Sequence, residues 1–126
     1  MAAFESEFHV HVLTKPMTLY RGCRGRDQRA LEEAVSSNFQ VGRSPHPTDL
    51  HAAVLYMAVS MFASSATIAA LARRRPGRIG THVACMELQP GHGVCVADTG
   101  GVGHWSVWGV PALLVQFVVS VEEVAA

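Results

Sequence analysis

The sequence has little charge and almost no lysine. Charged residues make up 16% of the 126 positions, the ten basic and ten acidic side chains cancel, and Lys15 is the only lysine. A chain without net charge exerts no long-range field that would draw it to nucleic acid or to an anionic membrane. We therefore expect neither a membrane nor a nucleic acid as partner. The arginines do cluster, at positions 21–29 and 73–78, a skew that GC-rich coding alone would also produce.

Cysteines and long apolar segments are scarce as well. The three cysteines, Cys23, Cys85 and Cys95, form no CxxC pair, and an odd number cannot close a full disulfide framework. The longest apolar stretch, Ala52–Ala63, is interrupted by Ser60 and is too short to span a bilayer. The N-terminal residues lack the basic and apolar segments of a secretory signal. These absences predict a cytoplasmic protein with reduced thiols.

Apolar residues are plentiful, at 49% of the chain, which is ample for one buried core. No linker or repeat divides residues 1–126, so a single domain is predicted. Alternating β-branched segments predict strands, and apolar residues at helical spacing predict helices. Predicted strands cover residues 8–13, 17–21, 81–88, 94–97 and 113–121, and predicted helices cover residues 27–35, 50–60 and 66–75. The expected fold class is α+β, a single compact domain with strands at both ends packed with three helices.

Some details of this pattern are specific enough to compare with a structure. Asp27 and Ser65 stand where helix N-caps are expected. The helix over 50–60 is apolar nearly all round, which is typical of a central, buried helix. Residues 61–65 fit a short strand or a turn. The strands over 81–88 and 94–97 predict a hairpin, and residues 98–109 predict a loop.

The first candidate site is the end of the strand over 17–21, where Tyr20, Arg21 and Gly22 follow one another. The planar fork of an arginine donates two parallel hydrogen bonds to phosphate. Gly22 would let a ligand or the backbone approach closely. Alternatively, Arg21 is the first solvated residue after a buried strand and Gly22 serves the turn.

The second candidate site is the segment 60–65, which precedes an alanine-rich helix. If this segment is extended, Ser60, Phe62 and Ser64 share one face and could line a pocket wall beside Arg21. Ser65 is explained by its capping role. Spacing alone does not show whether the pocket exists.

The third candidate site is the segment 99–109, which concentrates glycine with His104, Trp105 and Trp108. Glycine-rich loops can cradle phosphate, but the known fingerprints require a helix directly afterwards, and none is predicted here. The two tryptophans either cover the core or stack on a ligand ring while His104 bonds to it. The same loop could also hold a protein partner.

The histidines suggest a metal site that the spacing does not support. His9 and His11 point to one face of their predicted strand, and His92 and His104 could approach from loops. Zinc needs three or four convergent ligands, and no HExxH motif is present. Hydrogen-bonded or surface imidazoles explain the same residues, so no metal is predicted.

The order of these motifs resembles the small ADP-ribosyltransferase fold, including its NAD-consuming, toxin-like bacterial relatives of the RES type. The matching features are Tyr20-Arg21-Gly22 on an early strand, Ser60 to Ser65 before a helix, and Val83 to Leu88 as the following strand. The resemblance extends from Thr18 to Val121. It implies a transferase fold with NAD as cofactor.

The resemblance also implies roles for single residues. Arg21, with Tyr20 and Gly22, would hold an NAD phosphate. Ser60 or Ser64 would brace the nicotinamide pocket, beside Phe62 and the tryptophans Trp105 and Trp108. His104 and Ser64 are the predicted catalytic residues.

The sequence departs from the family at its late glutamate, which is expected to bond the ribose and support the departure of nicotinamide. Residues 104–111 contain no carboxylate, Glu87 lies on an earlier predicted strand, and Glu122 and Glu123 follow the last one. The departure of nicotinamide leaves a positive charge on the ribose. His104 cannot supply the negative charge that would stabilise it.

Three functions therefore stay open. The leading hypothesis is an NAD-binding domain of ADP-ribosyltransferase type that transfers ADP-ribose to a macromolecule or hydrolyses NAD. The second is a noncatalytic binding module with a degenerate nucleotide pocket. The third is a metal-dependent small-molecule enzyme that uses His9, His11 and a loop histidine.

Overall fold

The computed structural model describes residues 9–37, 57–99 and 103–124. Within these residues, seven strands form one sheet in the order β1-β5-β6-β3-β2-β4-β7, and every neighbouring pair is antiparallel. The strands are β1 (His11–Val12), β2 (Met17–Cys23), β3 (Val59–Phe62), β4 (His82–Leu88), β5 (Cys95–Asp98), β6 (His104–Trp108) and β7 (Val118–Glu123).

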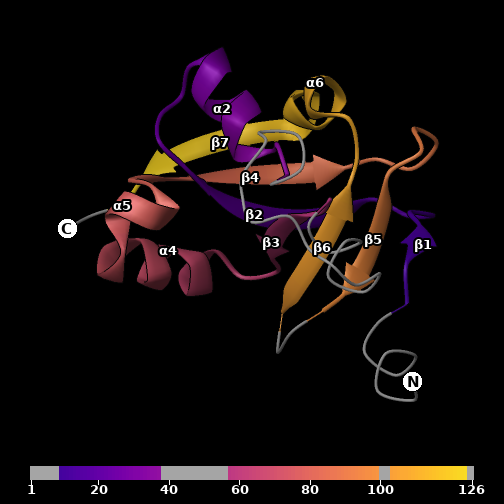
Figure 1. Cartoon of the computed structure of the whole chain (residues 1–126), viewed down its shortest axis with the longest axis horizontal. Helices are drawn as coiled ribbons and strands as arrows, with labels where there is room; N and C mark the ends of the chain where they lie inside the picture. Colours follow the sequence, from indigo (N-terminus) through magenta and orange to yellow (C-terminus); the bar gives the residue numbers. More distant parts are fainter. Residues whose placement is uncertain (1–8, 38–56, 100–102, 125–126) are drawn as a thin grey trace.

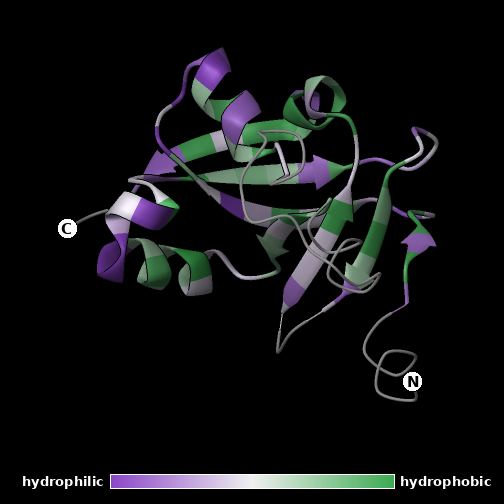
Figure 2. Ribbon diagram, viewed as in Figure 1, coloured by the Kyte–Doolittle hydropathy of each residue, from purple (hydrophilic) through white to green (hydrophobic). Residues whose placement is uncertain are grey.

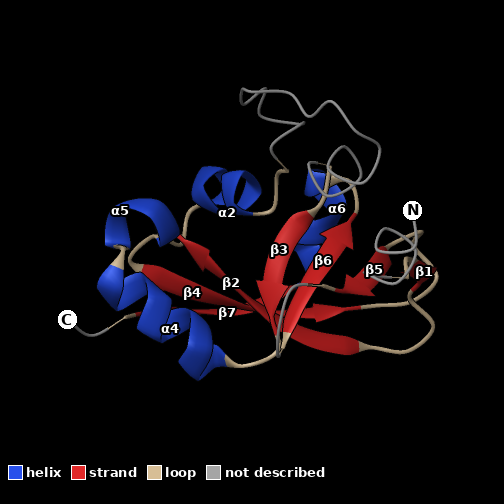
Figure 3. Ribbon diagram, turned by 60° about the horizontal axis from the view of Figure 1, so that its bottom comes forward, coloured by secondary structure: helices blue, strands red, loops and turns tan. Residues whose placement is uncertain are grey.

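Helices cover both faces of this sheet. They are α2 (Gln28–Ala34), α4 (Ser65–Arg74), α5 (Pro76–Ile79), α6 (Pro111–Leu114) and the 3-10 turn η1 (Val115–Phe117). In Figure 1 and Figure 3, α2 and α6 lie on one side of the sheet and α4 lies on the other. The domain is therefore mixed α/β, and the predicted α+β class is confirmed at this level. No helix in the described ranges is long and apolar enough to cross a membrane.

The main core lies between the sheet and the side that carries α2, α6 and η1. Leu19, Met61, Met86 and Val107 are fully buried and come from four adjacent strands. They pack with Leu114 of α6 and with Phe117 of η1, and Figure 2 shows α6 as mostly apolar. Burying each such side chain contributes about 1.5–3 kcal/mol. Because side chains alternate along a strand, the residues between them point to the α4 side.

The predicted helices over 27–35 and 66–75 are confirmed as α2 and α4. The Asp27 carboxylate caps α2 by accepting a hydrogen bond from the Ala30 N–H at 3.1 Å. The cap of α4 is Ser64, whose hydroxyl accepts from the Thr67 N–H at 3.4 Å. The prediction of Ser65 as N-cap is wrong by one residue, because Ser64 keeps the extended backbone of a cap while Ser65 is already helical.

The predicted hairpin between residues 81–88 and 94–97 is wrong. β4 pairs with β2 and β7, whereas β5 pairs with β1 and β6. The hairpin is formed by β5 and β6 instead, so the predicted loop over 98–109 is also wrong where β6 runs through it. The alternation of histidine, tryptophan, serine, valine and tryptophan in β6 suits a strand, and the neighbouring glycines obscured this signal.

Three predicted boundaries differ from the structure. The helix predicted over 50–60 falls mostly outside the described residues, and its predicted end is wrong because Val59 and Ser60 belong to β3. The strand predicted over 113–121 begins only at Val118, because Pro111 opens a helical turn. The first predicted strand reduces, among described residues, to the two residues of β1.

Candidate functional site

A small cavity of about 120 Å³ lies where the end of β2, the C-terminal end of α2, the start of β3 and α5 meet. Three arginines line it, Arg21, Arg24 and Arg78, and we call it the arginine cavity. Its other polar lining residues are Glu33, Ser36, Ser37 and Ser60. Pockets for drug-sized ligands measure about 300–1,000 Å³, so this cavity suits a single small group.

Arg21 connects three elements around the cavity. Its Nε donates to the Ala34 carbonyl at 2.8 Å and its Nη1 donates to the Ser60 carbonyl at 3.1 Å, both partly buried. Ala34 is the last residue of α2, where the helix dipole is negative and favours a cation. The suggestion that Arg21 is merely a solvated residue after the strand is therefore wrong, since its side chain joins α2 to β3.

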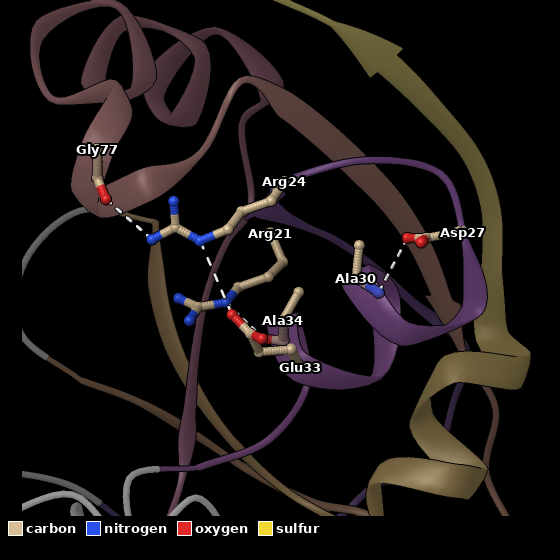
Figure 4. Close-up of polar contacts among 7 residues, drawn as sticks. All are labelled: Arg21, Arg24, Asp27, Ala30, Glu33, Ala34 and Gly77. Atoms are coloured by element: carbon tan, nitrogen blue, oxygen red, sulfur yellow. Dashed lines mark hydrogen bonds and ion pairs between the residues drawn. The ribbon is translucent and has the colours of Figure 1, made fainter.

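Arg24 and Arg78 bring charge from two distant parts of the chain. Arg24 Nη2 donates to the Gly77 carbonyl of α5 at 2.8 Å, and its Nε lies 3.8 Å from the Glu33 carboxylate. Figure 4 shows the guanidinium groups of Arg21 and Arg24 side by side, with Arg21 bonded to Ala34 of α2 and Arg24 between Glu33 and Gly77. Arg78 is exposed and belongs to α5.

Gly22 is required by the close approach of α5 to β2. A Cβ atom on Gly22 would overlap the side chain and the carbonyl of Ile79. Gly80, which follows Ile79, has a φ of 113°, and a Cβ atom on Gly80 would overlap the Cys23 carbonyl. The backbone segment that approaches Gly22 is therefore α5, which brings Arg78 to the cavity. The strand predicted over 17–21 is too short by two residues, since β2 continues through Gly22 to Cys23.

Cys23 is the cavity's thiol. Its side chain is 2% exposed, and burial raises the pKa of the Cys23 thiol, although a hydrogen bond with the Gly25 backbone and the charges of Arg21 and Arg26 act in the opposite direction. Burial disfavours the thiolate, so Cys23 is a neutral packing residue rather than a nucleophile at neutral pH.

Phe62 and His104 meet on the α4 side of the sheet, opposite the main core. They are paired in the register of β3 and β6, and their rings are in edge contact with centroids 5.2 Å apart. His104 Nδ1 contacts both the carbonyl and, at 3.1 Å, the hydroxyl of Thr99, whose hydroxyl lies 2.7 Å from that of buried Ser106. A carbonyl only accepts, so Nδ1 is the donor in its contact with the Thr99 carbonyl.

The remaining predicted site residues are dispersed. Ser64 caps α4, and Trp105 packs, partly buried, against the main core. Trp108 lies three residues along the same strand and therefore points to the other face. The two tryptophans thus do not form one stacking platform.

Tyr20 faces a second, larger hollow of about 490 Å³, which we call the α4 hollow. The hollow lies between α4 and strands β4 and β7, and its lining includes Arg73, Cys85, Glu122 and Glu123. The pKa of Tyr20 is raised, first by the neighbouring Cys85, then by burial, and also by Glu122. Glu122 and Glu123 are the last residues of β7, so the expectation that they follow the final strand is wrong.

The metal hypothesis gains no support from the described residues. Among them, no three histidine, cysteine, aspartate or glutamate side chains are grouped closely enough to hold a metal ion. His9 and His11 are exposed.

The structure brings Arg21, Gly22 and Ser60 to one cavity, and it brings Phe62 to His104. It separates Tyr20, Ser64 and Trp105 from both groups. Sequence reasoning missed Arg24 and Arg78, although both belong to the arginine clusters that the sequence displays. Comparison of the chain with protein-family models, with curated proteins and with solved structures finds no match.

Proposed function

We propose that this chain is an NAD-binding domain of ADP-ribosyltransferase type, with the arginine cavity as its phosphate subsite. The observation that carries the proposal is the meeting of Arg21 and Ser60, from two of the three motifs, at one cavity lined by two further arginines. Guanidinium groups are suited to phosphate because each donates parallel hydrogen bonds and stays charged.

The third motif lies on β6, the strand next to β3. β2, β3 and β6 are consecutive in the sheet, so the three sequence motifs lie on adjacent strands. In an extended dinucleotide the phosphates lie in the middle and the nicotinamide riboside lies at one end, so separate subsites are expected. His104 lies on the other face of the sheet from the arginine cavity and Ser64 caps α4, so the proposal gives neither side chain a contact with a dinucleotide bound at the phosphate subsite.

NAD binding and nicotinamide release test the proposal directly. We would measure both, by calorimetry and by a product assay, on the wild type and on Arg21→Gln and His104→Gln. Arg21→Gln should abolish binding and release, while His104→Gln, on the other face of the sheet, should retain both. A thermal unfolding curve for each variant shows whether the fold is intact, because Arg21 also bonds to α2 and β3.

Each alternative has its own outcome. If the wild type binds NAD without releasing nicotinamide, the chain is a noncatalytic nucleotide-binding module rather than an enzyme. That module is consistent with segment 104–111, which has no carboxylate. A folded wild type that binds no dinucleotide at millimolar concentration would overturn both versions.

A further inference from the structure

The charge of the arginine cavity matches a free phosphate ion better than it matches a phosphate of a dinucleotide. Its described lining residues include three guanidinium groups, of Arg21, Arg24 and Arg78, and one carboxylate, of Glu33. The formal balance is three positive charges minus one negative charge, which is two positive charges. Each phosphate of NAD is a diester with one negative charge, so its binding leaves one positive charge unbalanced. A phosphate group with fewer ester bonds takes up a second negative charge near neutral pH.

Two of these arginines are oriented without a ligand, by partners that leave their charge intact. Arg21 donates to the carbonyls of Ala34 and Ser60. Arg24 donates to the carbonyl of Gly77. A carbonyl is neutral, so these hydrogen bonds orient the guanidinium groups without cancelling their charge. Groups that are already oriented lose less conformational freedom on binding, so the cavity is partly preorganised for an anion.

The size and the surroundings of the cavity suit one small anion. Its volume of about 120 Å³ is well below the roughly 300 Å³ at which pockets for drug-sized ligands begin. The Ala34 carbonyl, at the negative end of α2, would repel an anion, but it already accepts a hydrogen bond from Arg21 Nε. Arg78 of α5 lines the cavity from an exposed position, so its side chain is accessible to an ion from solvent.

We propose that the arginine cavity binds one free phosphate dianion through Arg21, Arg24 and Arg78 together, and that inorganic phosphate thereby competes with NAD. The competition rests on the proposed function, because it requires that a phosphate of NAD occupies the same cavity. A dianion balances both net positive charges, whereas a diester balances one, and the attraction between charges grows with their product. Since the cavity accepts one small group, phosphate and NAD exclude each other.

Calorimetric titration of the full chain tests the inference at about pH 8, where phosphate is largely a dianion. The probes are inorganic phosphate and dimethyl phosphate, a diester with one charge, and NAD is titrated with and without phosphate. The ionic strength is held constant, because salt screens exposed charges. The variants are Arg78→Gln and Arg24→Gln, both at exposed positions. The control is Arg74→Gln, which removes the same charge from an exposed position of α4 that does not line the cavity.

The expected result is that phosphate binds at least about tenfold more tightly than dimethyl phosphate and weakens the apparent affinity for NAD. Arg78→Gln and Arg24→Gln should each lower the affinity for phosphate by about tenfold or more, whereas Arg74→Gln should preserve it.

The other outcomes separate this inference from the proposed function. Equal affinities for phosphate and dimethyl phosphate, or NAD binding that phosphate does not weaken, would overturn the inference and leave the proposed function standing. Phosphate binding that Arg78→Gln and Arg24→Gln leave unchanged would also overturn the inference. Phosphate binding that depends on Arg78, with no NAD binding, would support the phosphate site and overturn the proposed function.

Discussion

Tyr20 and Arg21 are neighbours in β2, yet they line different cavities. Arg21 points to the arginine cavity, which is small and has two net positive charges among its described lining residues. Tyr20 points to the α4 hollow, which is about four times larger and combines Arg73 with Glu122 and Glu123. The larger space has no excess positive charge for a phosphate. Charge and fixed donors, rather than volume, therefore distinguish the cavity that we propose as the phosphate subsite.

The largest effect on stability is expected from a substitution that would push α5 away from β2. Gly22→Ala would place a methyl group against the side chain and carbonyl of Ile79, so we expect a loss of about 2–3 kcal/mol in the free energy of unfolding. Denaturant titration measures this loss. Gly77→Ala in α5 is the matched control, because a Cβ there meets no atom within 4 Å. Equal stability of the two variants would mean that α5 does not require a glycine in β2.

The next largest effect is expected from Arg21 itself. Arg21→Leu leaves the carbonyls of Ala34 and Ser60 without this donor, which should cost about 2 kcal/mol in the free energy of unfolding. Arg29→Leu, at an exposed position of α2, should change stability by no more than about 0.5 kcal/mol. A result in which the two variants are equally stable would remove the structural role that we assign to Arg21.

A smaller effect is expected at alkaline pH, where the two cavities each contain a group with a raised pKa. The folded state holds the Cys23 proton more tightly than the unfolded state does, since burial raises the pKa above the usual 9.0. Stability from this group is therefore complete below pH 9.0 and declines as the pH rises through the folded-state pKa.

The measurement is the free energy of unfolding at several pH values between 7 and about 10, because above the usual pKa of 10.0 Tyr20 adds a decline of the same sign. Cys23→Ala should flatten the decline in this range. An unchanged pH dependence in Cys23→Ala would show that folding does not raise the pKa of the Cys23 thiol.

The smallest effect is expected from filling the α4 hollow. Ala69→Leu adds apolar volume at the helix face that lines the hollow, and it should change the stability by less than about 1 kcal/mol. Dinucleotide and phosphate affinities should match those of the wild type, because neither ligand is placed there. Weaker binding in Ala69→Leu, measured by calorimetry, would move the site from the arginine cavity to the α4 hollow.

Much of the local structure was predictable because its causes are local. The carboxylate of Asp27 and the apolar spacing after it define α2, and the alanine-rich segment with its terminal arginines defines α4. The strand over 17–21 is confirmed as the greater part of β2. The boundary errors arose where local signals compete, as at Ser64 and Ser65, where adjacent serines are equally able to cap.

The candidate site was predictable only in part. Arg21, Gly22 and Ser60 line one cavity, whereas Phe62 and Ser64, which the prediction placed with Ser60 on one pocket wall beside Arg21, do not line it. Arg24 and Arg78 could not be added from the sequence, because the Gly77 carbonyl that holds Arg24 lies 53 positions away along the chain. The pairing of Phe62 with His104 was equally hidden, since it depends on the register of β3 with β6.

The sequence by itself therefore determined the class of the domain, the two main helices and the central strand that carries Arg21. These follow from spacing, capping and side-chain alternation, which act over a few residues. The tertiary structure decided that β4 lies between β2 and β7 rather than beside β5, and that α5 brings Arg78 to Arg21. Strand order and cavity lining depend on contacts between distant residues, and those contacts are selected by packing of the whole domain rather than by any local segment.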